Sequence, residues 1–381
     1  MGILDYVVEV KKVEEGSEVE SKYLKGVRHL CENGITRVPN KYILPLANRP
    51  EKGRKAAAAA TAAEPTLKLP VIDLAKLRSP DCRPQVLETL GKACENYGFF
   101  QVVNHGIDSE LVSRMASVGK RFFELPFEER VKYMTNDVRT PVRCGTSVNQ
   151  VIDSVFYWRD FLKLTCHPLD SVLPYWPSSP LDLREEARSY AEHSKSLFLE
   201  LVEAILDSLG VDTGRVLREF EDGSHLMVVN CYPPCPEPNL TLGMPPHSDY
   251  GFLTLLLQDD VHGLQAQCEG EWVTVEPVPN SLVVNVGDHL EIFSNGRYKS
   301  VLHRVLVNST KSRISVVSLH SLPVDSMVSP SPELVGEGNP RLYKDTDFAS
   351  FLDFMSSCEA KHKNFLETRK LTQGNKKNIK P

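Results

Sequence analysis

The chain has 381 residues, of which 41% are hydrophobic and 25% are charged, and its formal net charge is −6. This composition is typical of a globular protein, and the negative charge disfavours nucleic acid as a partner. Nine scattered cysteines indicate reduced thiols rather than a disulfide framework. The first twenty residues are too charged for a signal peptide, and no segment has the length of a membrane span. We therefore expect a soluble protein of the cytoplasm or nucleus, without a membrane partner.

The N-terminal half is expected to mix short strands with helices. Residues 1–65 should form a variable arm that contains a short helix and ends in an alanine-rich linker, and residues 66–222 a mainly helical region on the substrate side. The pattern predicts strands at 70–74 and 99–103, a loop followed by a strand at 141–164, and helices at 84–97, after Asp108 and at 183–209.

The pattern changes after residue 222. From Leu226 to Leu322, short apolar runs are broken by Pro, Gly and Asn-Gly turns, which is typical of an antiparallel sandwich or barrel. We expect a β-rich catalytic region at 223–330 and a helical tail at 331–381. The predicted fold class is mainly β with flanking helices.

A candidate metal site begins this β-rich region. His247 and Asp249 are two residues apart at the start of an apolar run, so an extended chain would direct both side chains to one face. His303, on a later strand, is the third candidate ligand. Two histidines and one carboxylate with open positions form the ligand set of non-haem Fe(II) oxygenases. Cys231 and Cys235 resemble half a zinc site, but no second cysteine pair accompanies them.

A candidate anion site follows the third ligand. Arg313 and Ser315 form another same-face pair, and the guanidinium could hold a carboxylate through two parallel hydrogen bonds. A solvent-exposed arginine is the alternative interpretation. Tyr232 could donate a further hydrogen bond to the same carboxylate, although a tyrosine of the hydrophobic core would fit the sequence equally well.

Six motifs make the chain resemble the plant 2-oxoglutarate- and Fe(II)-dependent dioxygenases, the group of flavanone 3-hydroxylase and flavonol synthase, over residues 67 to 365. The motifs are YGFFQVVNHG (97–106), NCYPPCP (230–236), HSD (247–249), GLQ (263–265), HR (303–304) and RIS (313–315). The resemblance implies a double-stranded β-helix, or cupin-like jelly roll, with helices around it.

The resemblance also implies roles for single residues. His247, Asp249 and His303 match the iron ligands. Arg313 and Ser315 match the residues that bind 2-oxoglutarate, with Tyr232 assisting and Asn230 nearby. His105, His262 and His289 are interpreted as structural.

The implied reaction hydroxylates or desaturates a small plant metabolite with O₂, while 2-oxoglutarate is converted to succinate and CO₂. Ascorbate is an expected stimulant, and we expect a monomer. The lead substrate is a flavanone oxidised at C3; hormones, coumarins, alkaloids and terpenoids remain alternatives.

Two other classes of protein stay open, an oxidase of the same fold that needs no 2-oxoglutarate and a non-catalytic metabolite sensor. The candidate substrate-contacting residues are Phe156, Trp158, Phe161, Phe293 and Tyr250, together with Val148, His320 and Leu322.

Overall fold

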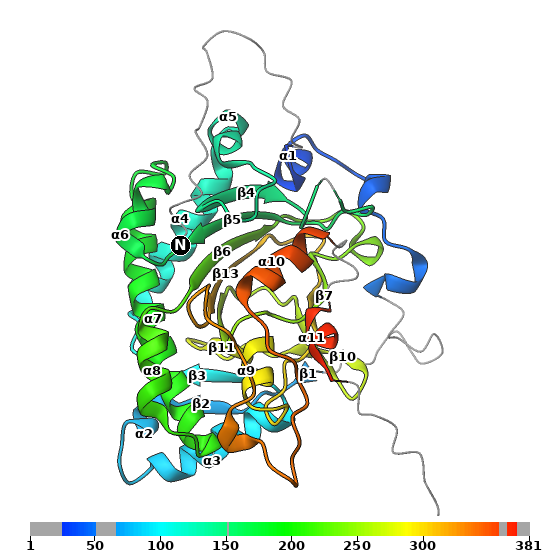
Figure 1. Cartoon of the computed structure of the whole chain (residues 1–381). Coiled ribbons are helices and arrows are strands. Elements are labelled where there is room, and N and C mark those ends of the chain that lie inside the picture. The colour runs from blue at the N-terminus through cyan, green and yellow to red at the C-terminus, as the bar shows by residue number, and fades with distance from the viewer. Residues whose placement is uncertain (1–24, 51–65, 151, 358–363, 372–381) are drawn as a thin grey trace, which may run out of the picture.

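The computed structural model describes residues 25–50, 66–150, 152–357 and 364–371. The expected alanine-rich linker lies outside these ranges. Within them, two β-sheets form the centre of the molecule and helices cover the large sheet on one side (Figure 1). This arrangement confirms the prediction of a mainly β protein with flanking helices.

The large sheet has eight strands, in the order β2-β3-β11-β8-β13-β6-β5-β4. Their bounds are β2 (Val71–Asp73), β3 (Phe99–Val103), β4 (Val142–Thr146), β5 (Asp160–Thr165), β6 (His225–Tyr232), β8 (Leu253–Gln258), β11 (Leu282–Val286) and β13 (Arg313–His320). Apart from the parallel pair β2 and β3, neighbouring strands are antiparallel. The sheet joins strands from both sides of the expected boundary at residue 222, since β5 pairs with β6 and β3 with β11.

The second sheet has five strands, in the order β1-β10-β9-β12-β7. Their bounds are β1 (Thr66–Leu67), β7 (Met244–His247), β9 (Leu264–Cys268), β10 (Glu271–Val275) and β12 (His303–Val305). A small cluster of buried apolar side chains combines residues of both sheets, among them Phe99, Leu256, Leu264 and Val283. The two sheets therefore share a hydrophobic interface, as expected for a jelly roll.

The helices lie outside the sheets. Their bounds are α1 (Val27–Glu32), α2 (Leu74–Leu77), α3 (Arg83–Asn96), α4 (Ser109–Glu124), α5 (Phe127–Arg130), α6 (Leu169–Val172), α7 (Leu183–Leu209), α8 (Thr213–Glu221), α9 (Asp288–Phe293), α10 (Phe348–Ser357) and α11 (Phe365–Arg369). Short 3-10 helices occupy Asn40–Tyr42, Leu46–Asn48, Val131–Tyr133, Leu173–Tyr175, Pro238–Leu240 and Pro332–Leu334. Among the described residues, no helix combines the length and the hydrophobicity that crossing a membrane requires.

The longest helix, α7, has the bounds that its apolar spacing predicts. Its buried positions repeat at helical intervals, and Gly210 ends it with φ of 73°, a left-handed conformation that glycine adopts without strain. Helix α4 starts after Asp108, whose Oδ1 accepts a hydrogen bond from the Glu110 N–H. The segment 141–164 differs from the prediction of a loop followed by one strand, because it contains two strands, β4 and the start of β5, joined by a loop.

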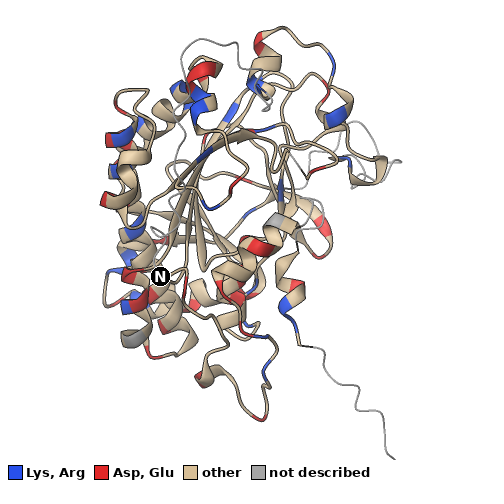
Figure 2. Cartoon of the chain, turned by 45° about the horizontal axis from the view of Figure 1, so that its top comes forward, with Lys and Arg blue, Asp and Glu red and all other residues tan. Residues whose placement is uncertain are grey.

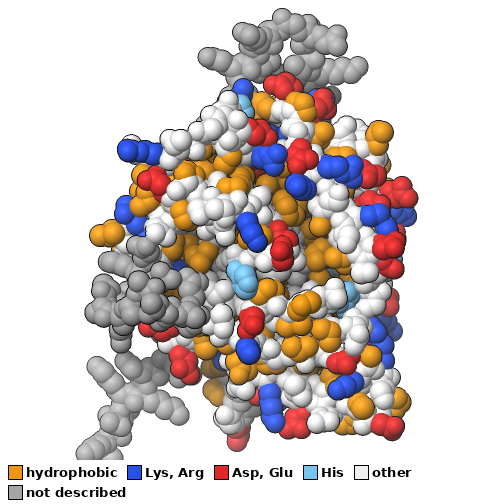
Figure 3. Space-filling model, turned by 180° about the vertical axis from the view of Figure 1, so that it is seen from behind, with side chains coloured by type: hydrophobic (Ala, Val, Ile, Leu, Met, Phe, Trp, Pro, Cys, Tyr) orange, Lys and Arg blue, Asp and Glu red, His pale blue; other side chains and the backbone are white. Residues whose placement is uncertain are grey.

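Charged residues lie mainly outside the two sheets. Figure 2 shows that Lys, Arg, Asp and Glu lie mainly on the outer helices and loops, whereas the strands carry few of them. On the rear face, charged side chains of both signs are interspersed with hydrophobic ones (Figure 3). Strand β8 (LTLLLQ) is buried at five consecutive positions because α7 packs near one face and the second sheet lies on the other.

One buried carboxylate fixes the N-terminal segment to the large sheet. The oxygens of Asp160 on β5 accept hydrogen bonds from the backbone N–H groups of Val27 and Arg28, at 3.0 and 2.9 Å. Gly26 precedes them with φ of 92°, and a Cβ atom there would lie 2.5 Å from Asp160 Oδ1. Helix α1 can therefore start against β5 only with glycine at position 26.

We expect Asp160→Ala to lower the free energy of unfolding by about 2–4 kcal/mol, because two backbone donors lose their acceptor. Denaturant unfolding measures this loss. Asp325→Ala, at an exposed position, is the control and should change the stability by less than about 0.5 kcal/mol. Equal stabilities of the two variants would contradict the anchoring role.

Candidate functional site

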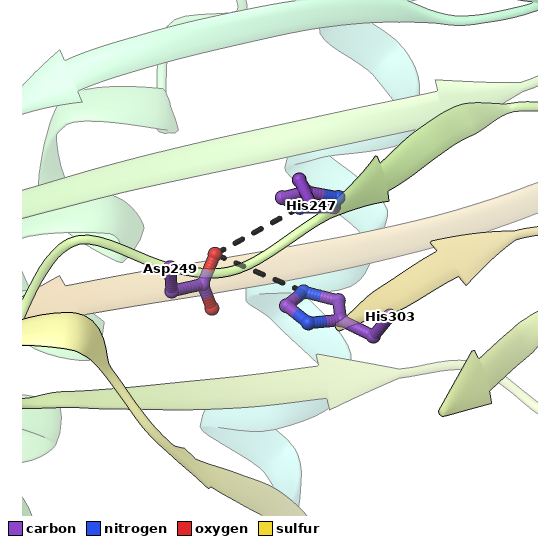
Figure 4. A group of neighbouring side chains, drawn as sticks. All are labelled: His247, Asp249 and His303. Atoms are coloured by element: carbon purple, nitrogen blue, oxygen red, sulfur yellow. Dashed lines mark ion pairs between the residues drawn. The ribbon is translucent and has the colours of Figure 1, made fainter. Parts of the chain in front are cut away.

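The pairing of β7 with β12 brings the two candidate histidine ligands together. His303 is the register partner of His247, and their ring centroids are 4.2 Å apart. Asp249 lies in the loop after β7, with its Oδ1 3.8 Å from Nε2 of each histidine. One ligand atom from each residue lies within 4.8 Å of the others, and the three side chains converge in Figure 4. The structure thus assembles the predicted triad.

Backbone carbonyl groups orient both imidazole rings. Nδ1 of His247 is 2.8 Å from the Pro245 carbonyl oxygen, and Nδ1 of His303 is 3.2 Å from that of Val301. A carbonyl oxygen only accepts, so the proton is placed on Nδ1 and the Nε2 lone pair faces Asp249. Burial, and then His303, lower the pKa of His247 to about 4, which keeps the ring neutral at neutral pH. Neutral imidazoles with free Nε2 atoms are suited to binding a metal ion.

Asp249 supplies the negative charge of the cluster. Its Oδ2 accepts a hydrogen bond of 2.9 Å from Asn285 Nδ2 on β11, which leaves Oδ1 directed at the histidines. Burial opposes ionisation, but His303, His247 and hydrogen bonds outweigh it, and the pKa of Asp249 lies below its ordinary value. One carboxylate beside two imidazoles is the donor set that Fe(II) oxygenases use.

Arg313 has a guanidinium that is only partly satisfied. Its Nη2 donates to Gln258 Oε1 at 2.9 Å and its Nε to the Val261 carbonyl at 3.2 Å. Nη1 is buried and has no hydrogen-bond partner among the described residues. An unmade hydrogen bond on a buried charged group is costly, so this Nη1 fits a carboxylate ligand. The side chain is 3% exposed, which excludes the solvent-exposed arginine that the sequence left open.

The neighbours of Arg313 complete a polar recess. Ser315 lies two residues further along β13, and Asn230 Nδ2 is 3.4 Å from its Oγ. Tyr232 is the register partner of Arg313 on β6, and its ring centroid is 5.3 Å from the guanidinium carbon. Gly263 leaves room for the arginine, because a Cβ there would be 3.1 Å from Arg313 Cδ. These residues could hold the distal carboxylate of 2-oxoglutarate.

A single cavity of about 280 Å³ is lined by both groups of residues. The triad, Arg313, Ser315, Asn230 and Tyr232 all contribute to its walls. Of the candidate substrate-contacting residues, Phe161, Tyr250 and Val148 line it as well. A metal ion and a carboxylate-bearing cosubstrate could therefore occupy one continuous space.

Three candidate substrate-contacting residues are placed elsewhere, which corrects the sequence prediction for them. Phe156 and Trp158 pack edge-on against Tyr42, at ring distances of 5.7 and 5.4 Å. Phe293 packs on Phe252 in the main core. None of the three is among the residues that line the cavity. Aromatic composition alone could not distinguish these core positions from Phe161.

The other histidines are also clear of the cavity. His105 accepts a hydrogen bond from the Ile107 N–H, His262 is exposed, and His289 lies 2.7 Å from Ser321 Oγ. His320 stacks on Phe198 at 4.5 Å, and Leu322 belongs to the main core. The interpretation of His105, His262 and His289 as structural agrees with these positions. The expectation that His320 and Leu322 contact the substrate is corrected.

Sequence reasoning missed several residues that line the cavity. Asn285 was not recognised as the partner of Asp249. Helix α10 contributes Phe351, Phe354 and Met355, and Tyr250 stacks on Phe351 with a ring distance of 4.5 Å. Three basic residues, Arg143, Arg159 and Lys163, line the cavity as well. The alternation of Arg159, Phe161 and Lys163 was the available signal for that wall.

Asn285 provides a test of the metal centre. We expect Asn285→Leu to weaken Fe(II) binding about 10- to 100-fold, because the Asp249 carboxylate loses the donor that orients it. Anaerobic Fe(II) titration measures the affinity. Asn339→Leu, at an exposed position, is the control. Unchanged affinity in a folded Asn285→Leu protein would contradict the role.

The sequence matches two protein-family models. Residues 223–321 match the 2OG-Fe(II) oxygenase superfamily, and residues 69–182 match the model described as non-haem dioxygenase in morphine synthesis N-terminal. Together the two matches span more than half of the chain. They cover the triad, Arg313 and the strands β3 to β5 of the N-terminal half.

Curated relatives extend over most of the chain. Protein DMR6-LIKE OXYGENASE 1 of Arabidopsis thaliana is 38% identical over 83% of this chain and 88% of the relative. Flavanone 3-dioxygenase 2 of Oryza sativa subsp. japonica is 40% identical over 82% of this chain and 89% of the relative. The family assignment therefore does not depend on the catalytic region alone.

Solved structures agree with the sequence relatives. JOX2 in complex with 2OG, Fe and JA is 32% identical, with a TM-score of 0.79, over 91% of this chain and 97% of that chain. The dioxygenase for auxin oxidation in rice is 26% identical, with a TM-score of 0.68, over 80% and 100% of the two chains. The chain therefore belongs to the 2OG-Fe(II) oxygenase superfamily and is a 2-oxoglutarate-dependent dioxygenase that uses Fe(II).

Proposed function

We propose that the enzyme hydroxylates or desaturates a flat aromatic metabolite, with a flavanone oxidised at C3 as the lead substrate. In this proposal His247, Asp249 and His303 bind Fe(II), and Arg313 with Ser315 binds 2-oxoglutarate. The observation that carries the assignment is the shared cavity, into which the triad and the partly satisfied Arg313 both project.

The chain positions the reactants and excludes water. When bound, Fe(II) and 2-oxoglutarate supply the oxidation of a C–H bond by O₂, coupled to loss of CO₂. Arg313 would fix one end of the cosubstrate, and the hydrogen bond from Asn285 would keep Asp249 Oδ1 directed at the metal position. The apolar side chains around the triad would keep bulk water from the reacting carbon.

The walls of the cavity support an aromatic substrate. Phe161, Tyr250 and, from α10, Phe351 and Phe354 all contribute aromatic rings to the walls. Flat ligands pack well against such rings through offset or edge-on contacts. The 40% identity to a flavanone 3-dioxygenase favours a flavanone. Other relatives have names that refer to jasmonate or auxin, so hormone substrates are the alternative that the assay must include.

The sequence alone left open an oxidase of the same fold that needs no 2-oxoglutarate. It would leave the buried Nη1 of Arg313 without a partner during catalysis, since no described residue satisfies it. This cost favours the dioxygenase over the oxidase.

The cofactor site can be tested without a substrate. Anaerobic addition of Fe(II) and 2-oxoglutarate should produce the weak visible charge-transfer band of the chelate. We expect no band in Asp249→Ala, which lacks the carboxylate ligand. In Arg313→Ala we expect the half-saturating concentration of 2-oxoglutarate to rise about 100-fold, because a buried charge-assisted pair is lost. Arg297→Ala, at an exposed position, is the matched control.

The substrate assignment has a separate test. With the flavanone naringenin, the wild-type enzyme should release one succinate for each molecule hydroxylated at C3, and Asp249→Ala should release none. Succinate release with a jasmonate or auxin, but not with naringenin, would replace the substrate and leave the reaction class intact. Product formation that needs ascorbate and O₂ but yields no succinate would favour the oxidase.

A further inference from the structure

The cavity has a second group of basic residues, on β5, on its neighbour β4 and at the residue just before β5. Arg159, Phe161 and Lys163 alternate along the chain and all three line the cavity, as does Arg143 on β4. Asp160 lies between them in sequence but points to the other face, where it binds the backbone of Val27 and Arg28. Within residues 159–163, the side chains that line the cavity are therefore basic and aromatic.

Arg159 is the least satisfied of these cations. The side chain is 8% exposed, and its Nε has no hydrogen-bond partner among the described residues. Nη1 contacts the Met244 sulfur, which is a weak acceptor, and no described carboxylate forms an ion pair with the guanidinium. Burial, with a smaller contribution from the charge of Arg143, lowers the pKa of Arg159 to about 10. An arginine remains charged at that pKa, so the site contains a buried positive charge that forms no ion pair with a described residue.

The neighbouring cations bind neutral groups. Lys163 Nζ donates to the Val138 carbonyl at 2.6 Å, and burial followed by the charge of Arg143 lowers its pKa to about 7. Arg143 donates through Nε to the Thr135 carbonyl at 2.9 Å. The charges of Arg143 and Arg159 repel each other, and that of Arg143 also disfavours a charge on Lys163. An anionic ligand beside Arg159 would offset this repulsion.

Phe161 provides a flat surface between two of these cations. Its ring centroid is 4.6 Å from the guanidinium carbon of Arg159 and 5.1 Å from that of Arg143. Its register partner on β4 is Gly145, where an added Cβ would be 3.2 Å from the ring. Glycine thus lets the ring lie against β4, and the wall combines an aromatic face with adjacent donors.

This wall is separate from the candidate cosubstrate site. Arg313 lies on β13, opposite Tyr232 of β6, whereas Asp160 of β5 pairs with Cys231 on the other side of β6. The backbone of Arg159 is therefore about two strand spacings, or roughly 10 Å, from the backbone of Arg313. Its contact with Met244, three residues before His247 on β7, puts it beside the metal centre.

We propose that Arg159 binds an anionic oxygen of the substrate, a carboxylate or an ionised phenol, while Phe161 packs on the adjoining aromatic ring. Lys163 is the second donor of this subsite. The inference rests on the proposed oxidation of an aromatic metabolite and deepens it, because it makes a negatively charged oxygen at one end of the molecule a requirement for binding.

Matched pairs of probes test the inference and distinguish the two sources of charge. The pairs are 4-coumarate with its methyl ester, and naringenin with its 7-O-methyl ether. Anaerobic calorimetry on the Fe(II)- and 2-oxoglutarate-loaded enzyme measures binding. We expect the acidic member of at least one pair to bind about tenfold or more tightly, as for a charge-assisted hydrogen bond. A carboxylate preference appears in the first pair, and a phenolate preference in the second.

Substitutions identify the residue responsible for that preference. In Arg159→Gln the preference should disappear, in Arg159→Lys it should be largely retained, and the half-saturating concentration of 2-oxoglutarate should change less than threefold in both. Arg121→Gln, at an exposed position, is the control. No preference in either pair, or a preference that survives in Arg159→Gln, would overturn the inference. Weaker 2-oxoglutarate binding with unchanged substrate binding would overturn it too, by assigning Arg159 to the cosubstrate.

A stability measurement needs no substrate. If Arg159 is a ligand-binding residue, Arg159→Met removes an uncompensated buried charge, and the melting temperature of the ligand-free protein should stay equal or rise. A clear fall would indicate a structural role and contradict the inference. The proposed function fails separately. Anion binding that depends on Arg159, without succinate release from any probe, would support the subsite and contradict the proposed oxidation of an aromatic metabolite.

Discussion

The register of β7 against β12 is the constraint on which the metal centre depends. His247 and His303 are 56 residues apart in sequence, and only their position as cross-strand partners brings the two Nε2 atoms next to the same oxygen of Asp249. A shift by one residue would turn one imidazole to the opposite face of the sheet. The carbonyls of Pro245 and Val301 belong to the same two segments, so the pairing that places the rings also orients them.

The large sheet connects this centre to the rest of the molecule. Its outer face packs on α4 and α7, and its inner face supplies the polar positions of the cavity. Because both faces are covered, a charged residue that is buried on an inner position depends on partners within the cavity. Arg313 and Arg159 are two such residues, on opposite sides of β6. The sheet thus holds two positive sites at a fixed separation, with the metal centre near both.

Local signals in the sequence predicted much of this arrangement. The i, i+2 spacing of His247 and Asp249 placed both on one side of the chain, and the apolar spacing of α7 gave its bounds. Strand register and edge position are non-local, so the sequence could not show that β5 joins β6 and presents Arg159 to the cavity. For the same reason Phe161 and Trp158 looked equivalent, although only the first lines the cavity. The short, fully buried helix α9 lies within the region for which the sequence predicted an antiparallel sandwich or barrel.

The stack of Tyr250 on Phe351 has a consequence for the order in which the site forms during synthesis. The triad, Arg313 and Arg159 all precede residue 320, whereas the wall contributed by α10 comes from residues 348–357. On the ribosome, the chain grows from its N-terminus and folds in that direction. The metal ligands therefore leave the ribosome while one side of the cavity is still missing, and the site becomes enclosed only after residues 348–357 have followed.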